Sequence, residues 1–93
     1  MTADKLLTVV KLNLSITTTG YDTYLGGLIE AAQDMIKREG IALTDSAEDV
    51  QLVVMYASYL FRKRAEDNPP MPRMLRYALN NRLFSQKIGG DPA

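Results

Sequence analysis

The chain has 93 residues, 46 % hydrophobic and 24 % charged, and its eleven basic and eleven acidic residues give a net charge of zero. These values predict one globular domain with a modest core, and they argue against a disordered chain or a dedicated DNA-binding protein, which is usually basic overall. Cys and His are absent, which excludes disulfides, zinc sites of the Cys/His type, thiol nucleophiles and His-based acid–base chemistry.

Neither a secretory leader nor a membrane span is expected. The N-terminus lacks a basic region followed by an apolar one, and no apolar run approaches the roughly 20 residues that span a bilayer. The most apolar stretch, 50–61, is short and contains Gln51 and Ser58. The absence of Cys suits the cytosol.

The first expected helix runs from about Ala3 to Leu12, with Thr2 as its N-cap. Its apolar positions are Leu6, Leu7, Val10 and Leu14. The hydroxyl-rich, β-branched segment 15–20 ends in Gly and predicts a loop, with a short strand as the alternative.

A second helix is expected over 22–39, with Asp22 as a cap and Gly40 in the left-handed position that ends it. Gly26 and Gly27 each cost a helix about 1 kcal/mol relative to Ala. Either they permit close backbone packing, or the helix begins only after Gly27. The spacing of one buried face is shown by Leu25, Leu28, Ile29, Ala32 and Ile36.

The third helix is expected to begin within 44–46 and to end near Ala65, a length of about 30 Å. Two pairs resemble a capping box: Asp45 with Glu48, or Ser46 with Asp49. One apolar stripe comprises Val50, Val53, Val54, Ala57, Leu60 and Phe61, and a second comprises Leu52, Met55, Tyr56 and Tyr59. A helix that is apolar on two sides is the central element of a domain, or has one face against a neighbour.

The segment 67–70 ends this helix, because residues before Pro avoid helical backbone angles. Pro72 is then placed as the first residue of a fourth helix that runs to about Phe84 or Gln86. Its apolar residues are Met74, Leu75, Ala78, Leu79 and Leu83. The sequence thus predicts an all-α fold: a compact bundle of about four helices in a single domain, 1–87, with a long central third helix and a flexible C-terminal tail, 88–93.

Charge is distributed unevenly along the chain. Up to Leu60 there are four basic and eight acidic residues, a net charge of −4, whereas from Phe61 onward seven basic and three acidic residues give +4. A chain with one acidic and one basic portion can attract copies of itself head to tail. The alternative is a solvated surface on which the asymmetry is accidental.

No constellation for catalysis emerges from the motifs. A Gly-rich phosphate loop is missing, and the acid pairs Glu48/Asp49 and Glu66/Asp67 are adjacent residues, whose side chains point in different directions on a helix. We therefore expect a non-enzymatic protein with no catalytic residue, no cofactor and no metal.

A basic cluster is the strongest polar feature of the sequence. Arg62, Lys63 and Arg64 are followed by Arg73, Arg76, Arg82 and Lys87. Three roles are open for these residues. They could complement the helix dipole, contact an acidic neighbouring subunit, or line a channel through which DNA passes. Tyr side chains at helical spacing favour core or interface positions over base stacking. The candidate interface or channel residues are therefore Arg62, Lys63, Arg64, Arg73, Arg76, Tyr56 and Tyr59.

Five segments, which fall in two halves of the chain, resemble the small phage head–tail connector (adaptor) proteins. The first half of the match is LNL at 12–14, a Tyr21-Asp22 helix entry and LIEAAQDMI at 28–36. The second half, ASYLFRKR at 57–64 and NPPMPRMLRYALNNRLF at 68–84, is similar to versions from prophages of Gram-positive bacteria. The likeness covers residues 5–87, although 15–20 replaces the long acidic loop of the family.

The resemblance implies a helical subunit of long-tailed DNA phages or prophages that has no catalytic activity, no cofactor and no metal. About a dozen copies would form a homo-oligomeric ring beneath the portal protein and join it to the tail or a stopper protein. DNA would pass through the central channel without sequence specificity. The expected location is the head–tail junction of the virion, with assembly in the bacterial host cytoplasm and no membrane contact.

Two other readings stay open. One is a small nucleic-acid-binding regulator of helix-turn-helix type, whose recognition helix would carry Arg73, Arg76, Asn80, Asn81 and Arg82, since Arg and Asn read base edges. The other is a different phage structural or packaging subunit.

Overall fold

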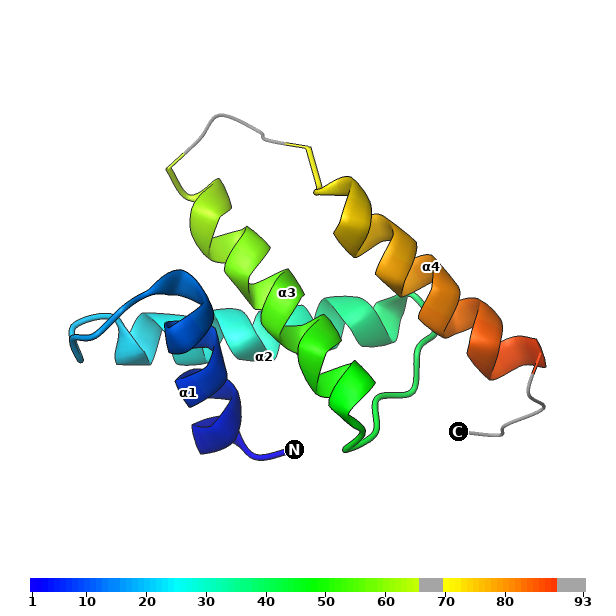
Figure 1. The fold of residues 1–93 in the computed structure, drawn as a ribbon, viewed down its shortest axis with the longest axis horizontal. Helices are drawn as coiled ribbons and strands as arrows, with labels where there is room; N and C mark the ends of the chain where they lie inside the picture. Colours follow the sequence, from blue (N-terminus) through cyan, green and yellow to red (C-terminus); the bar gives the residue numbers. More distant parts are fainter. Residues whose placement is uncertain (66–69, 89–93) are drawn as a thin grey trace.

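Four helices form the fold in the computed structural model, which describes residues 1–65 and 70–88. They are α1 (Ala3–Leu14), α2 (Asp22–Arg38), α3 (Ala47–Lys63) and α4 (Arg73–Ile88). In Figure 1, α1 and α4 lie on either side of α3, and α2 runs across behind it. The described residues contain no strand, so the all-α prediction is confirmed, and the alternative strand within 15–20 is wrong.

α3 occupies the centre, because it contacts each of the other three helices. It begins later and ends earlier than the sequence indicated, and its 17 residues equal those of α2. Its second stripe, predicted either to fill the centre or to meet a neighbour, lies mostly within its own chain: Leu52 and Tyr56 are buried, and Met55 and Tyr59 are half-buried. The fully buried core side chains come from all four helices and include Leu6, Val10, Leu25, Ile36, Val53, Ala57, Leu75 and Leu79.

Thr2, Ser46 and Gly40 act at helix ends as predicted, whereas Asp22 does not. The Thr2 side chain accepts a hydrogen bond from the Lys5 amide, and the Ser46 hydroxyl accepts one from the Asp49 amide. Gly40 has φ +99°, so the expected left-handed residue follows α2. Asp22 does not cap α2; it is the first helical residue, and its carboxylate binds Lys11 Nζ at 2.7 Å.

One interpretation of the glycine pair in α2, a late start of the helix, is wrong, and the other, close backbone packing, has no counterpart within this chain. The helix begins at Asp22, well before Gly27. A Cβ atom added at Gly26 or Gly27 would meet nothing within 4 Å, so no packing inside this chain requires the absence of a side chain there.

α4 begins directly after Pro72, whose carbonyl accepts the Arg76 amide at 3.1 Å. The helix continues to Ile88, two residues beyond the expected end, so Ile88 belongs to the helix rather than to the predicted tail. The rest of that tail, 89–93, and the link 66–69 lie outside the described residues.

Candidate protein-docking surface

α4 has two apolar faces, and only one of them is buried in the protein. Its inner face places Leu75, Leu79 and Arg82 in the core. Its outer face carries five residues in steps of three and four, which set side chains in one row along a helix. This row, here called the α4 stripe, comprises Met74, Tyr77, Asn81, Phe84 and Ile88.

The α4 stripe is open to solvent along its whole length. Its four large apolar side chains are between 57 % and 76 % exposed. Together they present roughly 500 Å² of surface, near the upper end for the largest apolar patch on a monomer. Isolated exposed apolar residues are ordinary, but a continuous row of them indicates a surface that another protein covers.

Shallow hollows border the stripe on two sides. One hollow lies between α3 and α4, and its lining residues are Glu48, Gln51, Leu52, Met55, Ala78 and Asn81. The other is lined by Asn80, Leu83, Phe84 and Lys87. The side chains of a second helix can interdigitate with such a ridge and its neighbouring grooves.

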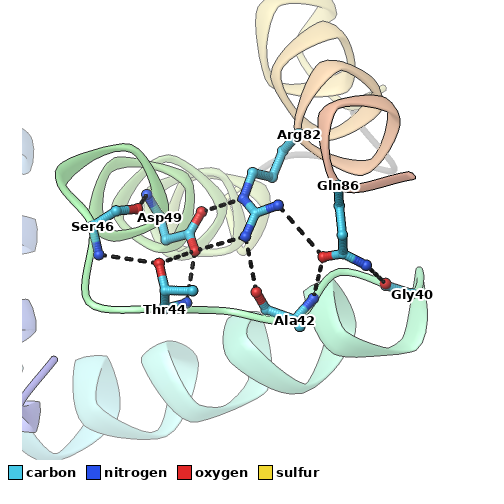
Figure 2. Close-up of polar contacts among 7 residues, drawn as sticks. All are labelled: Gly40, Ala42, Thr44, Ser46, Asp49, Arg82 and Gln86. Carbon is cyan, nitrogen blue, oxygen red and sulfur yellow. Dashed lines mark hydrogen bonds and ion pairs between the residues drawn. The ribbon is translucent and has the colours of Figure 1, made fainter. Parts of the chain in front are cut away.

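A buried ion pair fixes the orientation of α4 (Figure 2). Asp49, at the start of α3, is fully buried, and its carboxylate accepts hydrogen bonds from Arg82 Nε at 2.7 Å and Arg82 Nη2 at 3.2 Å. The amide and hydroxyl of Thr44 donate to the same carboxylate at 2.7 and 2.8 Å. Because Asp49 and Arg82 each have several partners, α4 is held in one rotational setting on α3, and the stripe faces outward.

The connection between α2 and α3 completes this network. Arg82 Nη2 donates to the Ala42 carbonyl at 2.9 Å. The Gln86 side chain accepts the Ala42 amide and donates to the Gly40 carbonyl, each at 2.9 Å. Figure 2 shows both side chains reaching down from α4 to this segment. Backbone groups of a loop are therefore satisfied by two side chains one turn apart on α4.

The electrostatics of Asp49 reflect two opposed effects. Burial raises the pKa of its carboxyl group, but the hydrogen bonds from Arg82 and Thr44 outweigh burial, so the pKa lies below its ordinary value of 3.8. Asp49 is consequently a charged partner of Arg82 and forms no reciprocal capping box with Ser46. The amide of Ser46 donates to the Thr44 hydroxyl instead.

Three of the predicted site residues lie near one another on the inner side of the bundle. Tyr56 is only 7 % exposed, and its ring lies 6.2 Å from that of Tyr59, centroid to centroid. Burial, the strongest influence, and the nearby Glu39 raise the pKa of Tyr56 above 10.0. Arg76 forms an ion pair with Glu39 of α2. Tyr56 and Arg76 thus make contacts inside their own chain.

The other four predicted site residues are exposed. Arg64 lies over the Phe61 ring at 4.0 Å and near the Tyr21 ring at 5.4 Å, and Lys63 lies 5.9 Å from the centre of the Tyr59 ring. Over 1–65 and 70–88, no carboxylate lies within ion-pair distance of these four cations, Arg62, Lys63, Arg64 and Arg73. The basic end of α3 therefore has charge available for an acidic neighbour.

The sequence reasoning missed the α4 stripe. Met74 was grouped with the apolar residues of the helix, Asn81 was considered only as a base-reading residue, and Ile88 was assigned to the tail. The signal was present in the sequence: α4 is apolar along two rows whose directions differ by about 150° at 100° per residue, and one small bundle covers only one of them.

Other site types find no support in the part of the chain that the structure describes. No group of three or more acidic residues is placed to hold a metal ion. None of the helices there combines the length and apolarity that crossing a bilayer requires. Comparisons with protein-family models, curated proteins and solved structures found no match to this chain.

Proposed function

We propose that this chain is a non-enzymatic structural subunit whose function is to bind copies of itself and other proteins, as the subunits of a phage head–tail connector ring do. The α4 stripe is the observation that carries the proposal. It is a row of four exposed apolar side chains with Asn81 at its middle, held outward by a buried ion pair, and a single chain of this size leaves it uncovered.

The resemblance of the sequence to connector proteins gives the proposal its specific form: a ring beneath the portal that joins the capsid to the tail. The exposed cations at the end of α3 suit such a position. They would meet an acidic neighbour or the DNA that passes through the channel, with no sequence specificity.

The regulator of helix-turn-helix type receives less support from the structure. Two of the residues that would read bases are engaged inside the chain, Arg82 with Asp49 and Arg76 with Glu39. The outward face of α4 is an apolar row, whereas a helix in the major groove presents polar side chains to base edges.

Native mass spectrometry across a concentration series, with and without a portal protein, tests the proposal. We expect oligomers or a portal complex for the unchanged chain, and their loss in the double variant Tyr77→Ser/Phe84→Ser. Leu12→Ser is the control, because Leu12 is an even more exposed apolar residue but lies on α1. A chain that stays monomeric throughout and ignores the portal protein would refute the proposal.

A second double variant tests two exposed cations, Arg62 near the end of α3 and Arg73 at the start of α4. Reversing Arg62 and Arg73 to Glu should weaken assembly and leave the helical circular-dichroism signal unchanged, because both side chains are exposed and neither has an ion-pair partner among the described residues. Unchanged assembly would remove these two residues from the interface.

A further inference from the structure

α2 carries a second exposed apolar row. Four of its residues follow one another in steps of four, three and four, the same spacing as in the α4 stripe. Tyr24 is 45 % and Met35 37 % exposed, while Leu28 and Ala31 are half-buried. This row, here called the α2 stripe, comprises Tyr24, Leu28, Ala31 and Met35.

Gly27 of α2 lies toward this stripe, about 70° from it at 100° per residue, whereas Gly26 lies on nearly the opposite side of the helix. Gly26 and Gly27 cost the helix about 1 kcal/mol each relative to Ala. Nothing in the chain approaches either position closely enough to require the absence of a Cβ atom. Small residues on a helix surface shorten the distance at which another helix packs against it. No contact within the chain explains Gly27, but a small residue at this position fits a helix that docks from outside.

Charge distinguishes the two stripes. α4 contains no acidic residue, and its exposed cations Arg73 and Lys87 lie along one flank of its stripe. On the exposed side of α2 next to its stripe lie the acids Glu30 and Asp34, and the cations Lys37 and Arg38 follow in the last turn, beyond Met35. Neither acid has an ion-pair partner among the described residues.

We propose that the α4 stripe of one copy packs against the α2 stripe of the next copy, head to tail. This arrangement covers both apolar rows, brings Arg73 and Lys87 near Asp34 and Glu30, and gives Gly27 a close neighbour. Two α4 stripes packed on each other would instead leave the α2 stripe exposed and place cations on both helices of the contact. The inference rests on the proposed function in one respect: that the neighbours of this subunit are copies of itself.

Because the contact area is small, we expect these surfaces to hold subunits together only in a closed ring. The α4 stripe offers roughly 500 Å², less than the roughly 800 Å² per partner of a standard stable interface. A single head-to-tail pair is therefore weak. In a ring every subunit uses both stripes, so each copy buries two contacts without leaving a free end.

Site-directed crosslinking tests the contact cleanly, because the chain has no Cys of its own. The variants Asn81→Cys and Ala31→Cys place one thiol near the middle of each stripe, where the two face each other whichever way the helices run. Each variant is treated with a short bismaleimide alone, and then the two are treated as a mixture. Circular dichroism confirms that both are folded.

We expect covalent dimers in the mixture and none from either variant alone. Dimers of Asn81→Cys alone would show a symmetric α4–α4 contact and overturn the inference. Native oligomers without any crosslink would overturn it as well, yet leave the proposed function standing. Monomers at every concentration, with and without a portal protein, would remove both.

Discussion

Replacing Arg82 by Met should destabilise the protein far more than any other loss of a basic residue. The change keeps a long side chain but leaves the carboxylate of Asp49, which is fully buried, with only the two hydrogen bonds from Thr44. Removing one partner of a buried ion pair costs about 3–5 kcal/mol of folding free energy. Because the two hydrogen bonds from Thr44 remain, we expect a loss of about 3 kcal/mol, at the lower end of this range. A 93-residue domain has a total stability of about 5–14 kcal/mol.

The pH dependence identifies the cause. In the unchanged chain the pKa of Asp49 is below 3.8, so its contribution is present above that pH and is lost as the pH falls through the folded value. Without Arg82, its hydrogen bonds and its charge no longer lower the pKa of Asp49, so this pKa rises above its value in the unchanged chain. The carboxylate of the variant is then protonated at a higher pH, and the variant regains stability relative to the unchanged chain as the pH falls into the acidic range.

Urea unfolding followed by far-ultraviolet circular dichroism measures both effects, and the midpoint of thermal unfolding should fall by roughly 12–24 °C. The double variant Asp49→Asn/Arg82→Met is the control, because an amide oxygen still accepts the Thr44 bonds but carries no charge. It should recover part of the loss at neutral pH. A loss below about 1 kcal/mol, or one that does not change with pH, would refute the reasoning.

Two further predictions concern stability at concentrations where the chain is monomeric. Gly27→Ala should raise the free energy of unfolding by up to about 1 kcal/mol, since the new methyl group meets nothing, whereas Gly40→Ala should lower it by about 1–3 kcal/mol because of the φ of +99°. Leu79→Ala should cost about 2–5 kcal/mol and Met74→Ala less than about 0.5, because one is buried and the other exposed. Equal effects within either pair, in the same urea assay, would contradict the assignment of these positions.

Local signals in the sequence predicted the helices and most of their ends. Thr2, Ser46 and Gly40 act at the ends of helices through their own hydrogen bonds or backbone angle, and such effects depend on a few neighbouring residues. Asp22 was wrongly expected to be a cap because its carboxylate has a better partner, Lys11, which is distant in sequence and known only from the fold.

The candidate surface was predicted less well, for a related reason. The sequence placed Arg76 and Arg82 in one basic cluster with Arg73, because all three share a helix and a charge. In the fold, Arg82 binds Asp49, 33 residues away, and Arg76 binds Glu39, 37 residues away, whereas Arg73 has no ion-pair partner among the described residues. Which arginines remain available to a partner is thus decided by tertiary contacts, and spacing along the chain carries no information about them.

The polar anchoring of α4 has a consequence for how this helix divides its side chains. A helix held to its bundle by apolar area alone needs a broad buried face. α4 instead uses Arg82 and Gln86 to bind Asp49 and the backbone between Gly40 and Ala42. These directional bonds set its rotation, which apolar contacts specify only loosely. A narrow inner row then suffices to bury α4, and the remaining apolar side chains form the outer stripe on a rigid support. Pre-orientation of this kind lowers the entropy that a docking partner must overcome.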